Sequence, residues 1–350
     1  MRRDRHILAA QIAIISEVVA LVSANLPILI VAVLAIHLVR NFTTKGVSKI
    51  PGPFLAKISN IWRFVDVARG RAHETHIKLH AQYGQYVRLG PNLVSVQNLE
   101  ASKKIYGVNK GYRKTEFYAV QQQLSNGRPT QTLLKTLDED FHAKIKRPIS
   151  NFYSMSTLTE FECFVDSTIE KLLEKLDEFA EAERECDLAT WLQYCKFVDD
   201  HEVFSWTLSN VNAGSDTTAI SLRAVLYYLL KNPTNLDKVM KEIVSARESG
   251  NMLRPVTWKE SQELPYLDAA IKEALRLHLA VGLLLERIVA KAGIQQPDGL
   301  FLPEGTVVGI NPWVMHRHPA FGTNLDAYIP ERWLQGKHES LDTDISSSSL

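Results

Sequence analysis

A long uncharged run near the N-terminus restricts the possible folds of this chain more than any other feature. Residues 18–39 contain no Asp, Glu, Lys or Arg and are mostly aliphatic. A helix that crosses a bilayer needs about 20 such residues. The sequence therefore predicts a membrane anchor in residues 1–49, with the span at about 18–39. A re-entrant pair and a signal peptide are the alternatives, but no small-residue cleavage site follows the run.

Basic residues flank this run on both sides. Arg40, Lys45 and Lys49 follow it, and three arginines lie within the first five residues. Cytosolic flanks of spanning helices are enriched in Lys and Arg, so the cations after the run favour a cytosolic main domain. The arginines before it favour the opposite orientation, and the topology of the anchor stays open.

The composition excludes several classes of protein. The 350 residues are 45% apolar and 23% charged with a net charge of +1, which is ordinary globular composition without a general attraction to nucleic acid. Cys163, Cys186 and Cys195 form no CxxC pair and leave an odd thiol, which argues against a disulfide scaffold or a zinc finger. We expect Cys163 in the core and the other two near the surface.

Hydrophobic periodicity and turn residues predict a mainly α-helical chain with a small β-sheet. Helices are expected at residues 72–83, 99–106, 141–148, 159–180, 199–231, 233–247 and 265–277. A hairpin is expected at residues 86–96, and further strands are expected at residues 281–289, 300–302 and 306–310. The polar, serine-rich residues 337–350 predict a disordered tail.

Three local patterns carry more specific expectations. The Pro-Gly-Pro sequence at residues 51–53 predicts a hinge between anchor and domain, because it cannot continue a helix. His73, His76 and His80 share one helix face, and a solvated polar face is favoured there over a metal site. The apolar stripe of residues 159–180 predicts core packing.

An unusual polar segment, Asn-Val-Asn-Ala-Gly-Ser-Asp-Thr-Thr, occupies residues 210–218 inside a long helical pattern. A glycine such as Gly214 costs a helix interior about 1 kcal/mol relative to Ala, and Ser, Asp and Thr compete for its backbone hydrogen bonds. A helix that opens a groove for a small ligand, with an acid beside an alcohol in that groove, would gather such residues. A polar turn between two shorter helices is the alternative.

Two further motifs follow, Glu-x-x-Arg at residues 273–276 and Pro-Glu-Arg-Trp at residues 330–333. Together with the anchor, the Pro-Gly-Pro sequence and the Ala-Gly-Ser-Asp-Thr-Thr segment, this ordered set resembles the membrane-bound cytochromes P-450, which are haem–thiolate monooxygenases. The motif sequences are similar to those of fungal members such as pisatin demethylase and benzoate para-hydroxylase. The resemblance implies a cytochrome P-450 fold, incomplete, over residues 50–336.

The resemblance implies a haem cofactor and the insertion of one oxygen of O₂ into a small apolar organic substrate. Electrons would come from NADPH through a separate NADPH–cytochrome P-450 reductase, since the sequence has no GxGxxG or GxxxxGK[ST] motif of its own. The implied location is the endoplasmic reticulum membrane, with the main domain on its cytosolic face. No nucleic-acid partner is implied.

The resemblance assigns catalytic roles within the polar segment. Ala213 and Gly214 would line the groove where O₂ binds. Asp216 and Thr217 would form an acid–alcohol pair that relays protons to it, because cleavage of O₂ needs protons from a positioned relay rather than from bulk water.

The resemblance also assigns residues to the haem surroundings. Glu273, Arg276 and Arg332 would form a buried charge triad that fixes the core behind the haem, and such a group holds geometry more than it adds stability. His142, Lys146 and Arg287 are the three candidates for binding the haem propionates. The family usually has Trp and Arg at the positions of His142 and Lys146, and a solvated strand charge is the alternative for Arg287.

The sequence departs from the family pattern in two places. The family's iron ligand is a Cys in a Phe-x-x-Gly-x-x-x-Cys-x-Gly loop after the Pro-Glu-Arg motif, and the sequence ends at Leu350 without it, so no axial ligand is assigned. Cys195 also lies almost next to Phe197, where the family has several helices between the two flanking segments, which predicts that a middle helical block is absent. We expect no hydroxylation by this polypeptide alone. The alternative functions are a catalytically inactive fragment or mis-joined gene model, and a membrane-anchored helical interaction module without cofactor.

Overall fold

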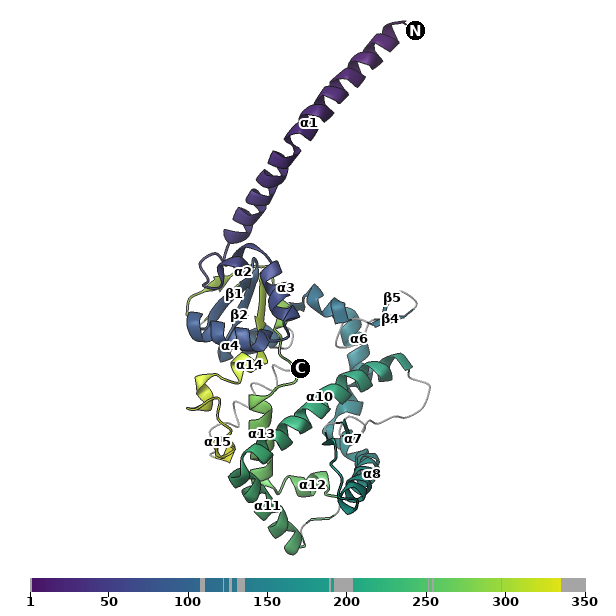
Figure 1. The fold of residues 1–350 in the computed structure, drawn as a ribbon, viewed down its shortest axis with the longest axis vertical. Coiled ribbons are helices and arrows are strands. Elements are labelled where there is room, and N and C mark those ends of the chain that lie inside the picture. Colours follow the sequence, from purple (N-terminus) through teal and green to yellow (C-terminus); the bar gives the residue numbers. More distant parts are fainter. Residues whose placement is uncertain are drawn as a thin grey trace.

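The computed structural model describes residues 2–107, 111–121, 123–125, 128–130, 136–188, 190–191, 204–250, 252–253, 255–296 and 298–334. Within these residues the chain is mainly helical with three small sheets, which confirms the predicted fold class. A long N-terminal helix projects from a layer that contains the sheet and several short helices, and most of the other helices lie on the opposite side of that layer (Figure 1).

The N-terminal part of the chain contains the projecting helix and the first strands. Its elements are α1 (Arg2–Phe42), α2 (Phe54–Ile58), α3 (Ile61–Ala68), α4 (Ala72–Tyr83), β1 (Tyr86–Gly90), β2 (Leu93–Val96), α5 (Leu99–Tyr106), β3 (Arg113–Lys114), η1 (Glu116–Gln121), β4 (Gln123–Ser125) and β5 (Arg128–Thr130). α6 (Glu139–Ile149), η2 (Ser150–Tyr153), α7 (Met155–Glu160) and α8 (Glu162–Glu181) follow.

The C-terminal part contains the long central helix and returns to the sheet. Its elements are α10 (Phe204–Lys231), α11 (Pro233–Glu248), α12 (Trp258–Ser261), α13 (Pro265–Leu277), β6 (Leu285–Ile288), β7 (Ile294–Gln295), β8 (Phe301–Leu302), β9 (Val307–Ile310), α14 (Pro312–Met315), η3 (Pro319–Phe321) and α15 (Glu331–Leu334). The predicted bounds of α4, α5 and α13 are confirmed.

The largest sheet joins the two ends of the chain in the strand order β1-β2-β9-β6-β3. β9 pairs in parallel with β2 and antiparallel with β6, and the short β3 pairs antiparallel with β6. Its buried apolar side chains form one core, which includes Val94, Val96 and Val308. A second core joins α10, α11 and α13 around Leu229, Val239 and Ala270.

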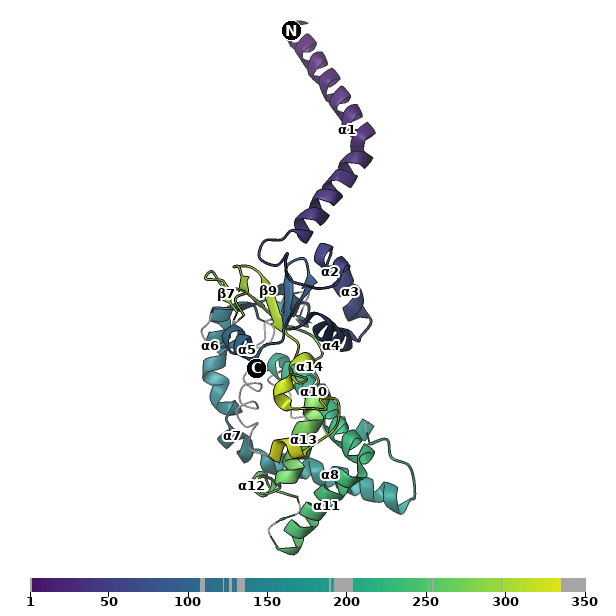
Figure 2. The same cartoon turned by 90° about the vertical axis from the view of Figure 1, so that its left-hand side faces the viewer.

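α1 is long and apolar enough to cross a membrane over Val22–Phe42, by length and composition, and none of that stretch is buried. Pro27 lies inside α1, and Figure 2 shows the helix bent partway along its length. Proline removes one backbone donor and is the commonest cause of such a kink. The expected boundaries of anchor, domain and tail stay predictions, and the tail lies outside the described residues.

The expectation for the α4 histidines is wrong. His76 and His80 are buried rather than solvated. His76 accepts a hydrogen bond from the side-chain amide of Asn311, with 2.9 Å between the nitrogens. His80 lies 2.8 Å from the carbonyl of Gly84 and 2.7 Å from the hydroxyl of Ser95. Asn311 and Ser95 lie outside α4, and these partners satisfy polar atoms that burial would otherwise leave unpaired.

The core predictions for α8 and for Cys163 are also wrong. α8 has no buried residue, and its stripe leaves Phe164, Val165 and Ile169 exposed. Cys163 on the same helix is exposed. The amphipathic pattern correctly predicts a helix with one apolar face, but within the described residues that face is at most half-buried, as at Leu172 and Leu176. The predicted join at Cys195–Phe197 lies outside the described residues.

Candidate functional site

Helix α13 carries the Glu-x-x-Arg motif. A proline and a carboxylate from α11 determine where this helix begins. Pro265 is at the first turn, where its missing N–H costs nothing. The carboxylate of Glu242 on α11 accepts from the backbone N–H groups of Tyr266 and Leu267 at 2.8 and 2.9 Å. A carboxylate at a helix N-terminus satisfies unpaired donors and interacts favourably with the helix dipole. α13 is thereby fastened to α11.

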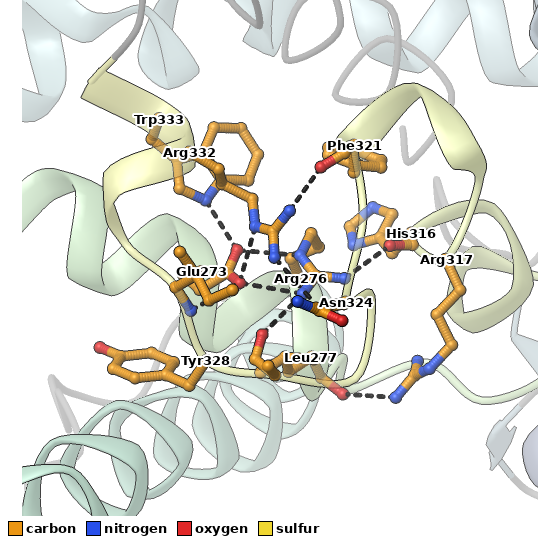
Figure 3. Close-up of polar contacts among 12 residues, drawn as sticks. Glu273, Arg276, Leu277, His316, Arg317, Phe321, Asn324, Tyr328, Arg332 and Trp333 are labelled. Atoms are coloured by element: carbon orange, nitrogen blue, oxygen red, sulfur yellow. Dashed lines mark hydrogen bonds and ion pairs between the residues drawn. The ribbon is translucent and has the colours of Figure 1, made fainter.

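Three charged side chains meet at one point, and we call Glu273, Arg276 and Arg332 the charge clasp (Figure 3). Arg276 donates twice to Glu273, with Nε–Oε2 and Nη2–Oε1 distances of 2.9 Å. Arg332 on α15 donates its Nε to Oε1 of the same carboxylate, also at 2.9 Å. All three side chains are buried. The arginines of the Glu-x-x-Arg motif and of the Pro-Glu-Arg-Trp segment therefore both bind the carboxylate of Glu273.

The rest of the charge clasp is satisfied by neutral groups. Glu273 also accepts from the backbone N–H of Ile329 at 3.0 Å and from the indole N–H of Trp333 at 2.9 Å. The two guanidinium groups donate their other N–H groups to backbone carbonyls. Those carbonyls belong to His316, Ala327, Phe321 and Asn324. A buried ion pair holds a fixed geometry only when its remaining polar atoms are satisfied in this way.

A second group of charges lies across the sheet edge and α6. β3 pairs with β6 so that Lys114 is directly opposite Arg287. α6 starts at the N-cap Asp138, whose carboxylate accepts from two backbone N–H groups, and it carries His142 and Lys146 one turn apart. We call Lys114, His142, Lys146 and Arg287 the cationic cluster.

The electrostatics of the cationic cluster are those of like charges held close together. The pKa of Lys114 is lowered by burial and then by Arg287, while Glu139 raises it and Lys146 lowers it again. The pKa of His142 is lowered by burial, by Lys114 and by Lys146, against an opposing effect of Glu139. Several cations near a single carboxylate repel one another, and an added anion between them would lower the energy of the group.

Arg287 is held mainly by aromatic groups. Its guanidinium lies 5.2 Å from the ring centre of Tyr106 and 5.7 Å from that of Tyr118, and it donates to the Tyr118 hydroxyl at 3.2 Å. Among the ion pairs that join described residues, none includes Arg287. Aromatic rings orient a guanidinium without neutralising it, so the charge of Arg287 stays available to an anionic ligand.

The polar segment lies inside the long helix α10. Gly214, Asp216 and Thr217 are exposed, and a Cβ on Gly214 would meet no atom within 4 Å. The Thr217 hydroxyl lies 3.5 Å from the carbonyl of Gly214. The side chain of Ala213 is outside the described part of the structure. This helix face is therefore open to a ligand at Gly214.

The structure also places residues near the site that sequence reasoning missed. Lys114, Tyr106 and Tyr118 surround Arg287, and Trp333 donates to Glu273. For the residues around Arg287, the only local signal in the sequence is the basic pair Arg113-Lys114. The register of β3 against β6 brings Lys114 opposite Arg287, and the sequence does not reveal that register. A surface groove of about 790 Å³ along α11 and α12 contains none of the predicted site residues.

Comparisons with known proteins point to one family. Residues 196–347 match the family described as Cytochrome P450. The chain is 33% identical to "Cytochrome P450 monooxygenase cicH" of Emericella nidulans, over 84% of this chain and 80% of the relative. It is 32% identical to "Cytochrome P450 monooxygenase pkfB" of the same organism, over 87% of this chain and 80% of the relative. A "Cytochrome P450 monooxygenase" of Aspergillus terreus is 30% identical over 92% of this chain and 88% of the relative.

The lengths of these alignments exceed the length of the chain. The alignments with cicH, pkfB and the Aspergillus terreus relative extend over 398, 411 and 437 positions, whereas the chain has 350 residues. Each alignment must therefore contain positions of the relative that face a gap in this chain. Within the matched span, these relatives carry residues that this sequence does not contain.

Proposed function

Since the chain belongs to the cytochrome P450 family, we propose that it acts as a membrane-anchored, haem-dependent monooxygenase on a small apolar organic substrate. The observation that carries this proposal is the charge clasp together with the separate cationic cluster. The resemblance of the motif sequences to those of pisatin demethylase and benzoate para-hydroxylase supports the choice of substrate class. NADPH would supply electrons through a reductase partner, with the domain on the cytosolic face of the endoplasmic reticulum.

The charges of the cationic cluster suit the carboxylates of a haem. Lys114 and Arg287 from the sheet edge, with His142 and Lys146 from α6, would bind the two propionates, which are anions. Burial lowers the pKa of Lys114 and of His142, and repulsion from the neighbouring cations lowers it further. Propionate binding would relieve that repulsion. Tyr106 and Tyr118 would orient Arg287 for this contact.

The bound haem would supply the iron at which dioxygen is activated. On α10, Gly214 would leave room for the small ligand. The Asp216 carboxylate would hold a proton and the Thr217 Oγ1 would pass it on, because cleavage of O₂ needs protons from a positioned relay rather than from bulk water. The charge clasp would keep α13 and α15 fixed behind the site. No residue of the printed sequence is assigned as the axial iron ligand.

Haem titration tests the role of the cationic cluster. We expect purified chain to bind haemin, followed by its Soret absorbance. Arg287→Ala and Lys114→Ala should each weaken binding roughly tenfold, which corresponds to the loss of one charge-assisted hydrogen bond. Lys241→Ala, which removes an exposed charge from α11, should leave binding unchanged. Equal affinity in all four proteins would refute the assignment of the cluster.

Transcript sequencing across Cys195–Phe197 and beyond Leu350, followed by expression of the encoded protein, tests the monooxygenase activity. That protein should give a thiolate-type spectrum when reduced and bound to CO, and should hydroxylate substrate when supplied with NADPH and reductase. The 350-residue polypeptide alone should give neither result. A thiolate-type spectrum from the 350 residues would contradict this expectation, and absence of haem from both proteins would favour an interaction module without cofactor.

A further inference from the structure

Two neighbouring residues of β6, Glu286 and Arg287, carry opposite charges and have separate partners. Arg287 belongs to the cationic cluster, whereas Glu286 lies outside it and is 2% exposed. The carboxylate of Glu286 accepts from the hydroxyl of Thr115 at 2.9 Å and pairs with the guanidinium of Arg63 on α3. Burial of a carboxylate costs free energy even when it is paired, and such pairs are retained in some proteins for the geometry that they hold.

Thr115 connects Glu286 to the turn that begins η1. The Thr115 side chain is buried, and its Oγ1 also accepts from the backbone N–H of Phe117 at 3.3 Å. The carbonyl of Thr115 accepts from the backbone N–H of Tyr118 at 3.2 Å. A threonine hydroxyl that bonds to the backbone two residues further on stabilises a turn. One hydroxyl therefore holds both the first turn of η1 and the carboxylate of β6.

The two aromatic residues in this turn contact two different guanidinium groups. The ring centre of Phe117 lies 5.3 Å from the guanidinium carbon of Arg63. The ring centre of Tyr118 lies 5.7 Å from that of Arg287, and the Tyr118 hydroxyl accepts from Arg287 at 3.2 Å. Since an aromatic ring orients a guanidinium, the place of η1 decides where Tyr118 holds Arg287.

Tyr106, the other ring beside Arg287, is attached independently of η1. Its hydroxyl donates to the carbonyl of Leu285 on β6 at 2.5 Å and accepts from the backbone N–H of Ile310 on β9 at 2.9 Å. The guanidinium of Arg287 also donates to the backbone carbonyl of Glu286 at 2.9 Å. Displacement of η1 would therefore remove one of the two rings from Arg287 and leave the other in place.

We propose that Glu286 is a positioning residue for Arg287. By binding Thr115 and Arg63 it keeps η1 against β6, and η1 in turn keeps Tyr118 on the guanidinium of Arg287. This inference rests on the proposed binding of haem propionates by Arg287. Charge alone predicts the opposite effect, because a carboxylate beside an anion site opposes the binding of an anion. Haem should bind more weakly without Glu286, although a negative charge has been removed.

Haemin titration of the full chain tests the direction of this effect. Glu286→Leu removes both acceptor oxygens, and Thr115→Val removes the hydroxyl without a change of charge. Each should weaken haemin binding roughly fivefold, which is less than the loss expected for Arg287→Ala because Tyr106 remains in place. Thr115→Ser keeps the hydroxyl and should bind haemin as the unaltered chain does. Tighter binding by Glu286→Leu, or equal losses in the two Thr115 variants, would overturn the proposal.

Combination with Arg287→Ala separates positioning from a general structural role. If Glu286 acts through Arg287, Glu286→Leu should cause no further loss of haemin affinity in a chain that already carries Arg287→Ala, because the two effects are then coupled. Losses that add in full would show that Glu286 affects binding by another route, and would refute its assignment as a positioning residue.

Fluorine NMR of a fluorotyrosine in place of Tyr118 examines the same contact without haem. Arg287→Ala should shift the resonance, and Glu286→Leu and Thr115→Val should shift it in the same direction, while Thr115→Ser should leave it unchanged. An unchanged resonance in Glu286→Leu would contradict the proposal whatever the haemin affinities are. If Arg287→Ala leaves haemin affinity unaltered, the proposed contact of Arg287 with a propionate is wrong, and the resonance still decides whether Glu286 positions Arg287.

Discussion

The charge clasp and helix α8 are opposite cases of how this chain uses its side chains. The clasp buries three charges and satisfies them with neighbours from α13, α15 and the loops between. α8 has an apolar stripe suited to burial, but within the described structure no residue of it is fully buried. A pattern on one helix specifies which face should be covered, but the cover has to come from another part of the chain. The relatives carry residues within the matched span that this chain lacks.

The largest expected effect comes from breaking the charge clasp. Glu273→Ala should destabilise the fold by about 3–5 kcal/mol, because it leaves two buried guanidinium groups without their carboxylate. Urea unfolding would measure this loss. Asp268→Ala on the same helix is the matched control, since Asp268 pairs with Lys272 at the surface and its loss should cost less than about 1 kcal/mol. Equal losses would show that the clasp contributes nothing special.

Substitution of one phenylalanine in each region compares the charge clasp with α8 directly. Phe321 beside the clasp is 1% exposed and Phe164 on α8 is 57% exposed. Phe321→Ala should cost about 3–5 kcal/mol, whereas Phe164→Ala should stay within about 0.5 kcal/mol. Thermal unfolding of the two variants checks the difference. A large cost at Phe164 would show that α8 is covered after all.

A smaller effect is expected from pH. Burial lowers the pKa of His80 from 6.5 to about 4. The unfolded chain takes up this proton below pH 6.5 but the folded chain does not until pH 4, so stability is lost as pH falls through that window. The total is on the order of 3 kcal/mol, at about 1.4 kcal/mol per pH unit. His80→Asn should reduce this slope between pH 6.5 and 4, and an unchanged slope would mean that His80 is not the titrating group.

Replacing exposed phenylalanines at α8 should change the stability of the fold least and its solubility most. Phe161→Ser combined with Phe164→Ser should reduce self-association with little effect on unfolding, because exposed apolar patches promote aggregation. Size-exclusion chromatography at several concentrations would measure it. Val120→Ser, which alters an exposed apolar residue elsewhere, should leave self-association as it is.

The sequence predicts local structure well where the signals are local. α4, α5 and α13 begin and end as expected because caps, prolines and glycines mark their ends. The meeting of Glu273 with Arg276 follows from their helical spacing, and the contribution of Arg332 required the family resemblance. β6 is shorter than the predicted strand of residues 281–289, since strand length depends on the partner strand β9.

The failures share one physical reason, which is dependence on distant partners. His76 and His80 look polar on the helix, but Asn311 and Ser95 determine that they are buried. The predicted hinge at residues 51–53 contacts β1, where the backbone N–H of Arg88 donates to the carbonyl of Pro51. Lys114 lies opposite Arg287 only because of the register of β3 against β6. No local pattern contains that information.

The position of β9 in the large sheet has a consequence for biosynthesis. β9 separates β2 from β6, and Asn92 after β1 donates to the carbonyl of Gly305, 213 residues further along the chain. A ribosome therefore completes β2 long before the strand that joins it to the rest of the sheet exists. Pairing between such distant segments is slow. The edge of β2 stays unpaired on this side until then, and the nascent chain is most exposed to proteases and to misassembly in that interval.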